Sequence, residues 1–189
     1  MEGKQVYIVH GYGASPGDHW FPWLSAQLQA QGARVTTLAL PDSGNPQAGA
    51  WQAALQAGIT RHDGNTYLIA HSLGCIATLH FLQSLPADMR IGGVVLVSGF
   101  SEKLPPLPQI DGFVAQPLDA ARLIAIVPQR AVIASRNDPI VPYALSVDLS
   151  RQLESTLVTV EQGGHFLGSE GFTTLPQAYD ALAAMMQRP

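Results

Sequence analysis

A serine lies between two short apolar runs in the segment Ala70-His71-Ser72-Leu73-Gly74. The run before it, residues 67–69, is typical of a buried strand, and the run after it, residues 75–79, is typical of a helix. A strand, a sharp turn and a helix in this order hold a serine hydroxyl clear of the sheet, as in the G-x-S-x-G nucleophile elbow. Ala70 stands where that pattern has its first glycine. Ser72 is therefore a candidate nucleophile, and a serine that caps a buried helix is the alternative.

A serine hydroxyl is a weak nucleophile, so it needs a base, and the base needs a carboxylate to orient it. In one large group of α/β enzymes these residues follow the chain order Ser, Asp or Glu, His, each after a strand. Asp138 follows a strand-like run at residues 130–135, and His165 follows another at residues 156–161. An ordinary Asp-Pro turn and an ordinary loop histidine are the alternatives. Because parallel strands end at one edge of a sheet, Ser72, Asp138 and His165 are expected to form a catalytic triad there.

Attack on a carbonyl carbon also needs two N–H donors for the oxygen that becomes negatively charged, an oxyanion hole. The N–H of Leu73, at the start of the helix predicted after the serine, is expected to be one donor. The second donor is expected from the loop at residues 10–13, His10-Gly11-Tyr12-Gly13. Tyr12 is the preferred donor in this loop, and Gly11 and Gly13 are alternatives.

Several residues near the predicted strand ends could contact a substrate. These candidates are His10, Gly11, Trp20, Phe100, Phe113 and Phe166. For each of the four aromatic residues, packing in the hydrophobic core is the alternative. Cys75 is the single cysteine, so an internal disulfide and a cysteine-rich zinc site are excluded. Cys75 could be a second nucleophile, but a small buried thiol in the core is the stronger interpretation.

No cofactor or metal ion is expected. The dinucleotide-binding pattern G-x-G-x-x-G fails after the first predicted strand, because Pro16 occupies the position of its third glycine. The sequence also lacks a Walker A pattern and any cluster of residues with metal-ligand spacing.

The charge and hydropathy of the chain exclude two classes of partner. With a net charge of −4 and only 10 lysines and arginines, the chain has no basic stripe for a nucleic-acid backbone. No apolar run approaches the length that crosses a membrane, and the N-terminal residues do not have the pattern of a cleaved signal. A cytoplasmic protein with a small-molecule acyl substrate is expected, and a protein partner cannot be read from the sequence.

Strand-like and helix-like patterns alternate along the chain. This alternation favours the α/β class, with a parallel sheet covered by helices on both faces. Strands are expected at about residues 4–9, 34–40, 66–70, 91–98, 130–135 and 156–161. Helices are expected from Ser15 as N-cap, from Asn45-Pro46, after Ser72, through Val141 to Leu153, and from Leu175 to Met185. A single domain over residues 1–189 is the natural reading of this length.

Residues 99–117 interrupt this alternation, since they contain four prolines and no clean period. A loop of this length inside a compact domain usually has a function, so a minimal cap or binding wall is expected. A rigid surface connector is the alternative.

Taken together, these residues make the chain similar to the small serine hydrolase family that includes retinoblastoma-binding protein 9, a branch of the α/β-hydrolase superfamily. The resemblance covers nearly the whole chain. It rests on His10-Gly11-Tyr12, Trp20 to Trp23, Pro41 with Pro46 and Trp51, Ala70 to Gly74, Ser98-Gly99-Phe100, Asn137 to Val141, and Gly164-His165-Phe166. It implies a trimmed three-layer α/β-hydrolase fold with about six mostly parallel strands and little cap. It also implies that Ser72, Asp138 and His165 match the family's triad.

The expected function is a serine hydrolase that cleaves a small ester, thioester or amide through an acyl-enzyme intermediate. Some relatives are known chiefly for binding another protein. A partner-binding protein on the same scaffold, with little or no turnover, is therefore the alternative.

Overall fold

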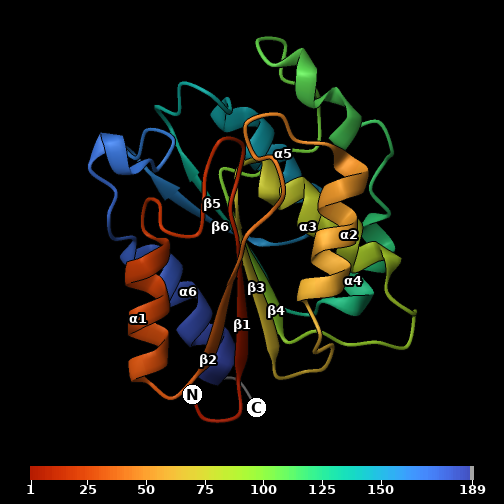
Figure 1. Cartoon of the computed structure of the whole chain (residues 1–189), viewed down its shortest axis with the longest axis vertical. Coiled ribbons are helices and arrows are strands. Elements are labelled where there is room, and N and C mark those ends of the chain that lie inside the picture. Colours follow the sequence, from red (N-terminus) through yellow and green to blue (C-terminus); the bar gives the residue numbers. More distant parts are fainter. Residues whose placement is uncertain (188–189) are drawn as a thin grey trace.

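Six parallel strands form one sheet in the order β2-β1-β3-β4-β5-β6 in the computed structural model, which describes residues 1–187 (Figure 1). The strands are β1 (Gln5–Val9), β2 (Arg34–Leu38), β3 (Thr66–His71), β4 (Gly93–Val97), β5 (Arg130–Ser135) and β6 (Thr156–Val160). The predicted parallel α/β architecture is confirmed. The inner strands β1, β3 and β4 are buried along their whole length, as expected for a parallel sheet covered on both faces.

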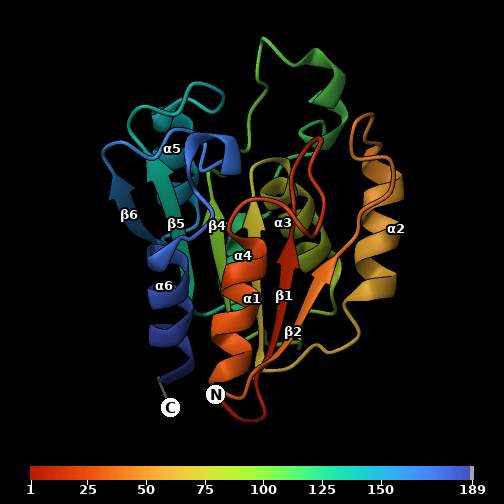
Figure 2. The same cartoon turned by 60° about the vertical axis from the view of Figure 1, so that its left-hand side comes forward.

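Helices cover both faces of the sheet (Figures 1 and 2). On one face lie α1 (Phe21–Ala30) and α6 (Pro176–Gln187). On the other lie α2 (Ala48–Gly58), α3 (Leu73–Ser84), α4 (Ala120–Ile126) and α5 (Tyr143–Gln152). Two short 3₁₀-helices, η1 (Pro108–Phe113) and η2 (Gly168–Glu170), lie in loops at the carboxyl end of the strands.

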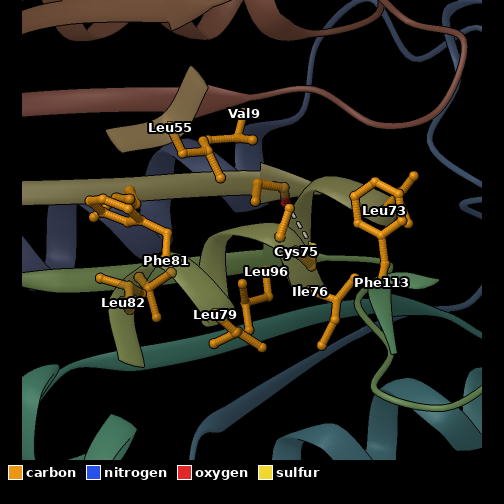
Figure 3. Packing of buried hydrophobic residues seen from close by; sticks show 14 of the residues in the cluster. Val9, Leu55, Leu73, Cys75, Ile76, Leu79, Phe81, Leu82, Leu96 and Phe113 are labelled. Atoms are coloured by element: carbon orange, nitrogen blue, oxygen red, sulfur yellow. Dashed lines mark hydrogen bonds between the residues drawn. The ribbon is translucent and has the colours of Figure 1, made fainter. Parts of the chain in front are cut away.

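Each face of the sheet has its own hydrophobic cluster. The larger cluster surrounds α3, in which nine of twelve residues are buried. Figure 3 shows Leu73, Ile76, Leu79 and Leu82 of this helix among residues from neighbouring elements. A helix that is apolar on nearly every side is typical of an element packed deep against a sheet. The helix that begins at Leu73 is therefore held firmly by its surroundings.

The first helix begins later than the sequence pattern predicts. Ser15 was expected to cap it, but the helix starts at Phe21. The Ser15 N–H donates to the Asp18 carboxylate at 2.7 Å, which forms a tight turn instead. His19 then adopts φ +52°, and a left-handed residue cannot continue a right-handed helix.

Residues 99–117 lie above the carboxyl end of the sheet (Figure 2). The segment contains η1, whose Ile110 and Phe113 are buried in the larger cluster. His80 Nε2 donates to the carbonyl of Phe113 at 2.9 Å, which ties the segment to α3. The short helix α4 that follows the segment was not predicted. Within residues 1–187, no helix is both long enough and apolar enough to cross a membrane.

Candidate active site

Ser72 lies in a sharp turn between β3 and α3 with φ +53° and ψ −123°. A strained backbone at the serine is typical of a nucleophile elbow, and a conformation of this kind costs about 1–3 kcal/mol. The turn is possible because Gly74 has no side chain. A Cβ at Gly74 would clash with the carbonyl oxygen of His10 and lie 2.9 Å from that of Val9. Ala70, in place of the pattern's first glycine, fits fully buried in the core.

Three side chains from three different loops form one hydrogen-bonded chain. His165 Nε2 lies 2.9 Å from Ser72 Oγ, and His165 Nδ1 lies 2.8 Å from Asp138 Oδ2 and 3.0 Å from Oδ1. A carboxylate only accepts, so Nδ1 carries the ring proton. Nε2 is then left with its lone pair and accepts the hydrogen bond from the Ser72 hydroxyl. The side chains of His165 and Asp138 are only 4% and 2% exposed, which limits competition from water.

Asp138 is fixed by three further donors. Its Oδ1 accepts the backbone N–H groups of Ile140 and Val141, each at 2.9 Å. Its Oδ2 accepts the hydroxyl of Ser98 at 2.8 Å, beside the bond from His165. Donors on both oxygens hold the carboxylate in one orientation and stabilise its negative charge.

The backbone of His165 is held from two sides. Glu170 Oε2 accepts the N–H groups of His165 and Leu167, at 2.8 and 3.0 Å. His71 Nε2 donates to the carbonyl of His165 at 2.8 Å, and the two rings pack with centroids 4.9 Å apart. Burial lowers the pKa of His71 well below its usual value, so this neighbour stays neutral at physiological pH. His71 thus supports the His165 backbone without placing a positive charge beside the ring.

The first turn of α3 provides free N–H groups next to the serine, because the first N–H groups of a helix have no intrahelical partner. A Cβ at Gly11 would lie 3.1 Å from Ser72 Cβ and 3.6 Å from the nitrogen of Leu73. Gly11 therefore keeps the space beside the Leu73 N–H open. Gly13 donates its N–H to the carbonyl of Ser43 at 2.7 Å, which removes it as a candidate donor; Tyr12, the preferred donor, and Gly11, the alternative, stay predictions.

A cavity of about 350 Å³ opens over the serine. Its lining residues are Gly11, Tyr12, Ala14, His19, His71, Ser72, Leu73, Leu104, Pro106, Leu107, Ile110, Pro139, Ile140, His165 and Leu167. The segment predicted to form a binding wall contributes four of these residues, from Leu104 to Ile110. Among residues 1–187, no aspartate, glutamate, lysine or arginine lines the cavity, so its surface is mostly apolar apart from Tyr12, the histidines and Ser72.

Comparison with known proteins identifies the family. A family model described as Serine hydrolase matches residues 6–184. The chain belongs to the serine hydrolase family. Its sequence is 45% identical over 185 residues to the protein YdeN of Bacillus subtilis (strain 168), which covers 98% of this chain and 97% of YdeN.

Solved structures of other proteins share the fold. The crystal structure of YdeN matches with a TM-score of 0.96, over 98% of this chain and all of that one. Est1E from Butyrivibrio proteoclasticus matches with a TM-score of 0.76 at 13% identity, over 99% of this chain and 90% of its own. The predicted α/β-hydrolase fold is thereby confirmed. The chain is a serine hydrolase family member, and the narrower resemblance to retinoblastoma-binding protein 9 stays a prediction.

Most of the residues proposed to contact substrate lie in the core of this serine hydrolase. Of the six, only Gly11 lines the cavity. The other five are buried away from it: His10, Trp20, Phe100, Phe113 and Phe166. Phe100 and Phe113 belong to the larger cluster, part of which, including Phe113, is drawn in Figure 3. Trp20 and Phe166 belong to the smaller one. Large aromatic side chains gain more from full burial than from a place in a pocket wall.

His10 is also occupied by structural contacts. Its Nδ1 donates to the carbonyl of Gly11 at 2.9 Å, and its Nε2 accepts the N–H of Leu40 at 3.0 Å. Burial lowers the pKa of His10, which keeps the ring neutral, as these two bonds require. Neither nitrogen is free to bind a substrate.

Cys75 is a buried thiol in the hydrophobic core, which is the interpretation favoured from the sequence. It is fully buried, and its Sγ lies 3.3 Å from the carbonyl oxygen of Ala70, the contact drawn in Figure 3. Burial raises the pKa of this thiol, and a protonated, buried thiol is a poor nucleophile.

Sequence reasoning missed several residues that the fold brings to the site. His71 and His19 line the cavity, yet neither is among the site residues predicted from the sequence. Ser98 and Glu170, which hold the carboxylate and the histidine loop, were not considered for these roles. His19, His71 and Ser98 each contact a residue at least 40 positions away in the sequence, so no local pattern could have identified them. Glu170 binds N–H groups only three and five residues away.

Proposed function

We propose that this protein is a serine esterase that hydrolyses small uncharged esters, with related thioesters and amides as further candidates, through an acyl-enzyme intermediate. The observation that carries the proposal is the hydrogen-bonded chain Ser72-His165-Asp138 at the base of an apolar cavity. In this proposal Ser72 is the nucleophile, His165 the base and Asp138 the residue that orients the base.

The reaction begins when His165 Nε2 removes the hydroxyl proton of Ser72, and Oγ attacks the carbonyl carbon of the ester. The N–H groups of Leu73 and Tyr12 stabilise the negative charge that develops on the carbonyl oxygen, each worth about 10²–10³-fold in rate. His165 then gives its proton to the alcohol oxygen as that bond breaks. A water molecule, deprotonated by His165, attacks the acyl-enzyme and releases the acid.

The substrate class follows from the cavity. Its volume of about 350 Å³ suits a small acyl group. Because no carboxylate, ammonium or guanidinium group of the described residues lines it, a charged acyl group would lose its water without gaining a partner. By analogy, a structure of similar fold, that of Est1E from Butyrivibrio proteoclasticus, is known with ferulic acid bound, which supports a small organic acid or its ester as the ligand.

Labelling with a fluorophosphonate tests the assignment of the nucleophile. The wild-type protein is expected to form one covalent adduct at Ser72 and to lose its ester hydrolysis. Ser72→Ala is expected to form no adduct and to hydrolyse no ester even without the label. Ser84→Ala, at the end of the same helix but outside the cavity, is expected to react like the wild type. An unreactive wild type, or equal labelling of Ser72→Ala, would contradict the proposal.

A further inference from the structure

His19 is a cavity residue with an unusual backbone. It has φ +52° in the turn just before α1, and its ring lines the cavity that contains Ser72. A left-handed backbone at a non-glycine residue is costly and persists where the surrounding structure fixes it, often at functional sites. Here that conformation ends the turn that begins at Ser15 and brings the His19 ring to the cavity.

The hydrogen bonds of His19 settle which of its nitrogens carries the proton. The backbone N–H of Gly168 donates to Nδ1 at 2.9 Å. An N–H group can only donate, so Nδ1 holds a lone pair and the proton of the neutral ring lies on Nε2. Burial lowers the pKa of His19, which agrees with a neutral ring. Among residues 1–187 Nε2–H has no hydrogen-bond acceptor, and it is not sealed from solvent.

His19 lies on the same side of the cavity as the base. Its ring is 5.6 Å from that of His71, which in turn is 4.9 Å from that of His165. Gly168, which His19 binds, is three residues beyond His165. The apolar wall from Leu104 to Ile110 belongs to a segment packed on the opposite face of the sheet.

This arrangement indicates which side of the cavity holds the alcohol part of the ester and which holds the acyl part. In the proposed reaction His165 must give its proton to the alcohol oxygen of the ester, so the alcohol part lies beside His165. The acyl part then lies against the apolar wall. His19 lines the cavity on this side and has a donor, Nε2–H, without a partner among residues 1–187.

We propose that His19 determines specificity by donating a hydrogen bond from Nε2–H to an oxygen in the alcohol part of the ester. The oxygen lies on the second carbon beyond the ester oxygen, because an oxygen on the first carbon would make an unstable acetal. The preferred substrates are thus small apolar acyl esters of ether or glycol alcohols. This inference rests on the proposed esterase function.

A matched pair of esters tests the proposal. 2-Methoxyethyl butanoate and n-butyl butanoate differ by one ether oxygen in place of a CH₂ group, and they yield the same acyl-enzyme. Their kcat/KM values report the acylation step, and each is divided by the rate of hydroxide-catalysed hydrolysis to remove intrinsic reactivity. A neutral hydrogen bond is worth about three- to tenfold, so the wild type is expected to prefer the methoxyethyl ester by about that factor.

Two variants test the acceptor at Nδ1 and the donor at Nε2 of His19 separately. Asn tolerates a left-handed backbone, and in His19→Asn the amide oxygen takes the place of Nδ1 as acceptor for Gly168 while the donor at Nε2 is lost. In His19→Gln the amide nitrogen takes the place of Nε2. The preference for the methoxyethyl ester is expected to disappear in His19→Asn and to persist in His19→Gln.

The outcomes distinguish this inference from the proposed function. Hydrolysis of n-butyl butanoate that is absent in Ser72→Ala supports the esterase, whatever the preference. A wild type without preference for the methoxyethyl ester overturns the role of His19, even if the variants fail to fold. Equal loss of activity on both esters in His19→Asn also overturns it, because it shows that His19 only supports the histidine loop.

Discussion

Ser98 donates its hydroxyl to Asp138 Oδ2 at 2.8 Å, on the same carboxylate oxygen that accepts Nδ1 of His165. Ser98 is fully buried, follows β4 directly and has φ +50°. The residue that follows β4 therefore holds the carboxylate of Asp138, which lies on the loop after β5. A strained backbone at Ser98 is consistent with this role, since it aims the hydroxyl at Asp138.

Two replacements of Ser98 should separate the stability that its hydrogen bond contributes from the stability that its backbone strain costs. Ser98→Ala is expected to lower the free energy of unfolding by about 1.5–3 kcal/mol, the usual worth of a hydrogen bond to a charged group. Ser98→Gly loses the same bond but relieves the left-handed strain, so it should be less destabilised. Urea denaturation of both variants measures this order, and a Gly variant less stable than the Ala variant would contradict it.

Gly74 and Gly49 offer a matched pair of helical glycines. A Cβ at Gly74 would run into the backbone carbonyls of His10 and Val9, whereas a Cβ at Gly49 would meet nothing within 4 Å. Gly74→Ala should cost about 1–3 kcal/mol or more and distort the turn at Ser72. Gly49→Ala should stabilise the protein by about 0.5–1 kcal/mol, because alanine favours the helix. Thermal unfolding checks both signs, and a harmless Gly74→Ala would disprove the tight elbow.

The apolar wall predicts a dependence on acyl length. In a series of p-nitrophenyl esters, kcat/KM should rise about fourfold per CH₂ from acetate to butanoate, which corresponds to about 0.8 kcal/mol per buried CH₂. It should fall once the chain exceeds the cavity. Leu107→Ala should move the optimum to longer chains, while Gln109→Ala, at an exposed position outside the lining, should not. A steady rise to long chains in the wild type would refute a small cavity.

Acid should destabilise this protein through buried neutral histidines. The pKa of His71 is lowered in the folded state by burial. As the pH falls below about 6.5, the unfolded chain therefore takes up a proton that the folded protein does not. The stability that is present above this pH is lost as the pH falls toward the lowered pKa. The lowered pKa values of His10 and His19 act in the same direction.

His71→Gln isolates the contribution of His71, because glutamine keeps a donor near the position of Nε2 for the carbonyl of His165. Urea midpoints at pH 7.5 and 5.5 are expected to differ less in this variant than in the wild type. Equal differences in the two proteins would show that His71 does not cause the acid sensitivity.

Sequence alone predicted the strands and the three residues of the hydrogen-bonded chain. Residues 130–135 were predicted as a strand and form β5 with those bounds, because β-branched and apolar runs in a parallel sheet are local signals. Ser72, Asp138 and His165 could be chosen because each follows such a strand. The rule that parallel strands end at one edge then brings them together without knowledge of side-chain contacts.

Only the tertiary structure determines which side chains surround Ser72, Asp138 and His165. The pattern at Ser15 and Asp18 predicted a helix start, but the left-handed backbone of His19 delays it to Phe21. The sequence could not separate aromatic residues of the core from those of a pocket wall, because both are apolar and burial depends on all neighbours at once. Likewise, Ser98 reaches Asp138 across 40 residues and His19 reaches Gly168 across 149. The chemistry is thus encoded in local patterns, whereas the supports and the shape of the cavity come from long-range packing.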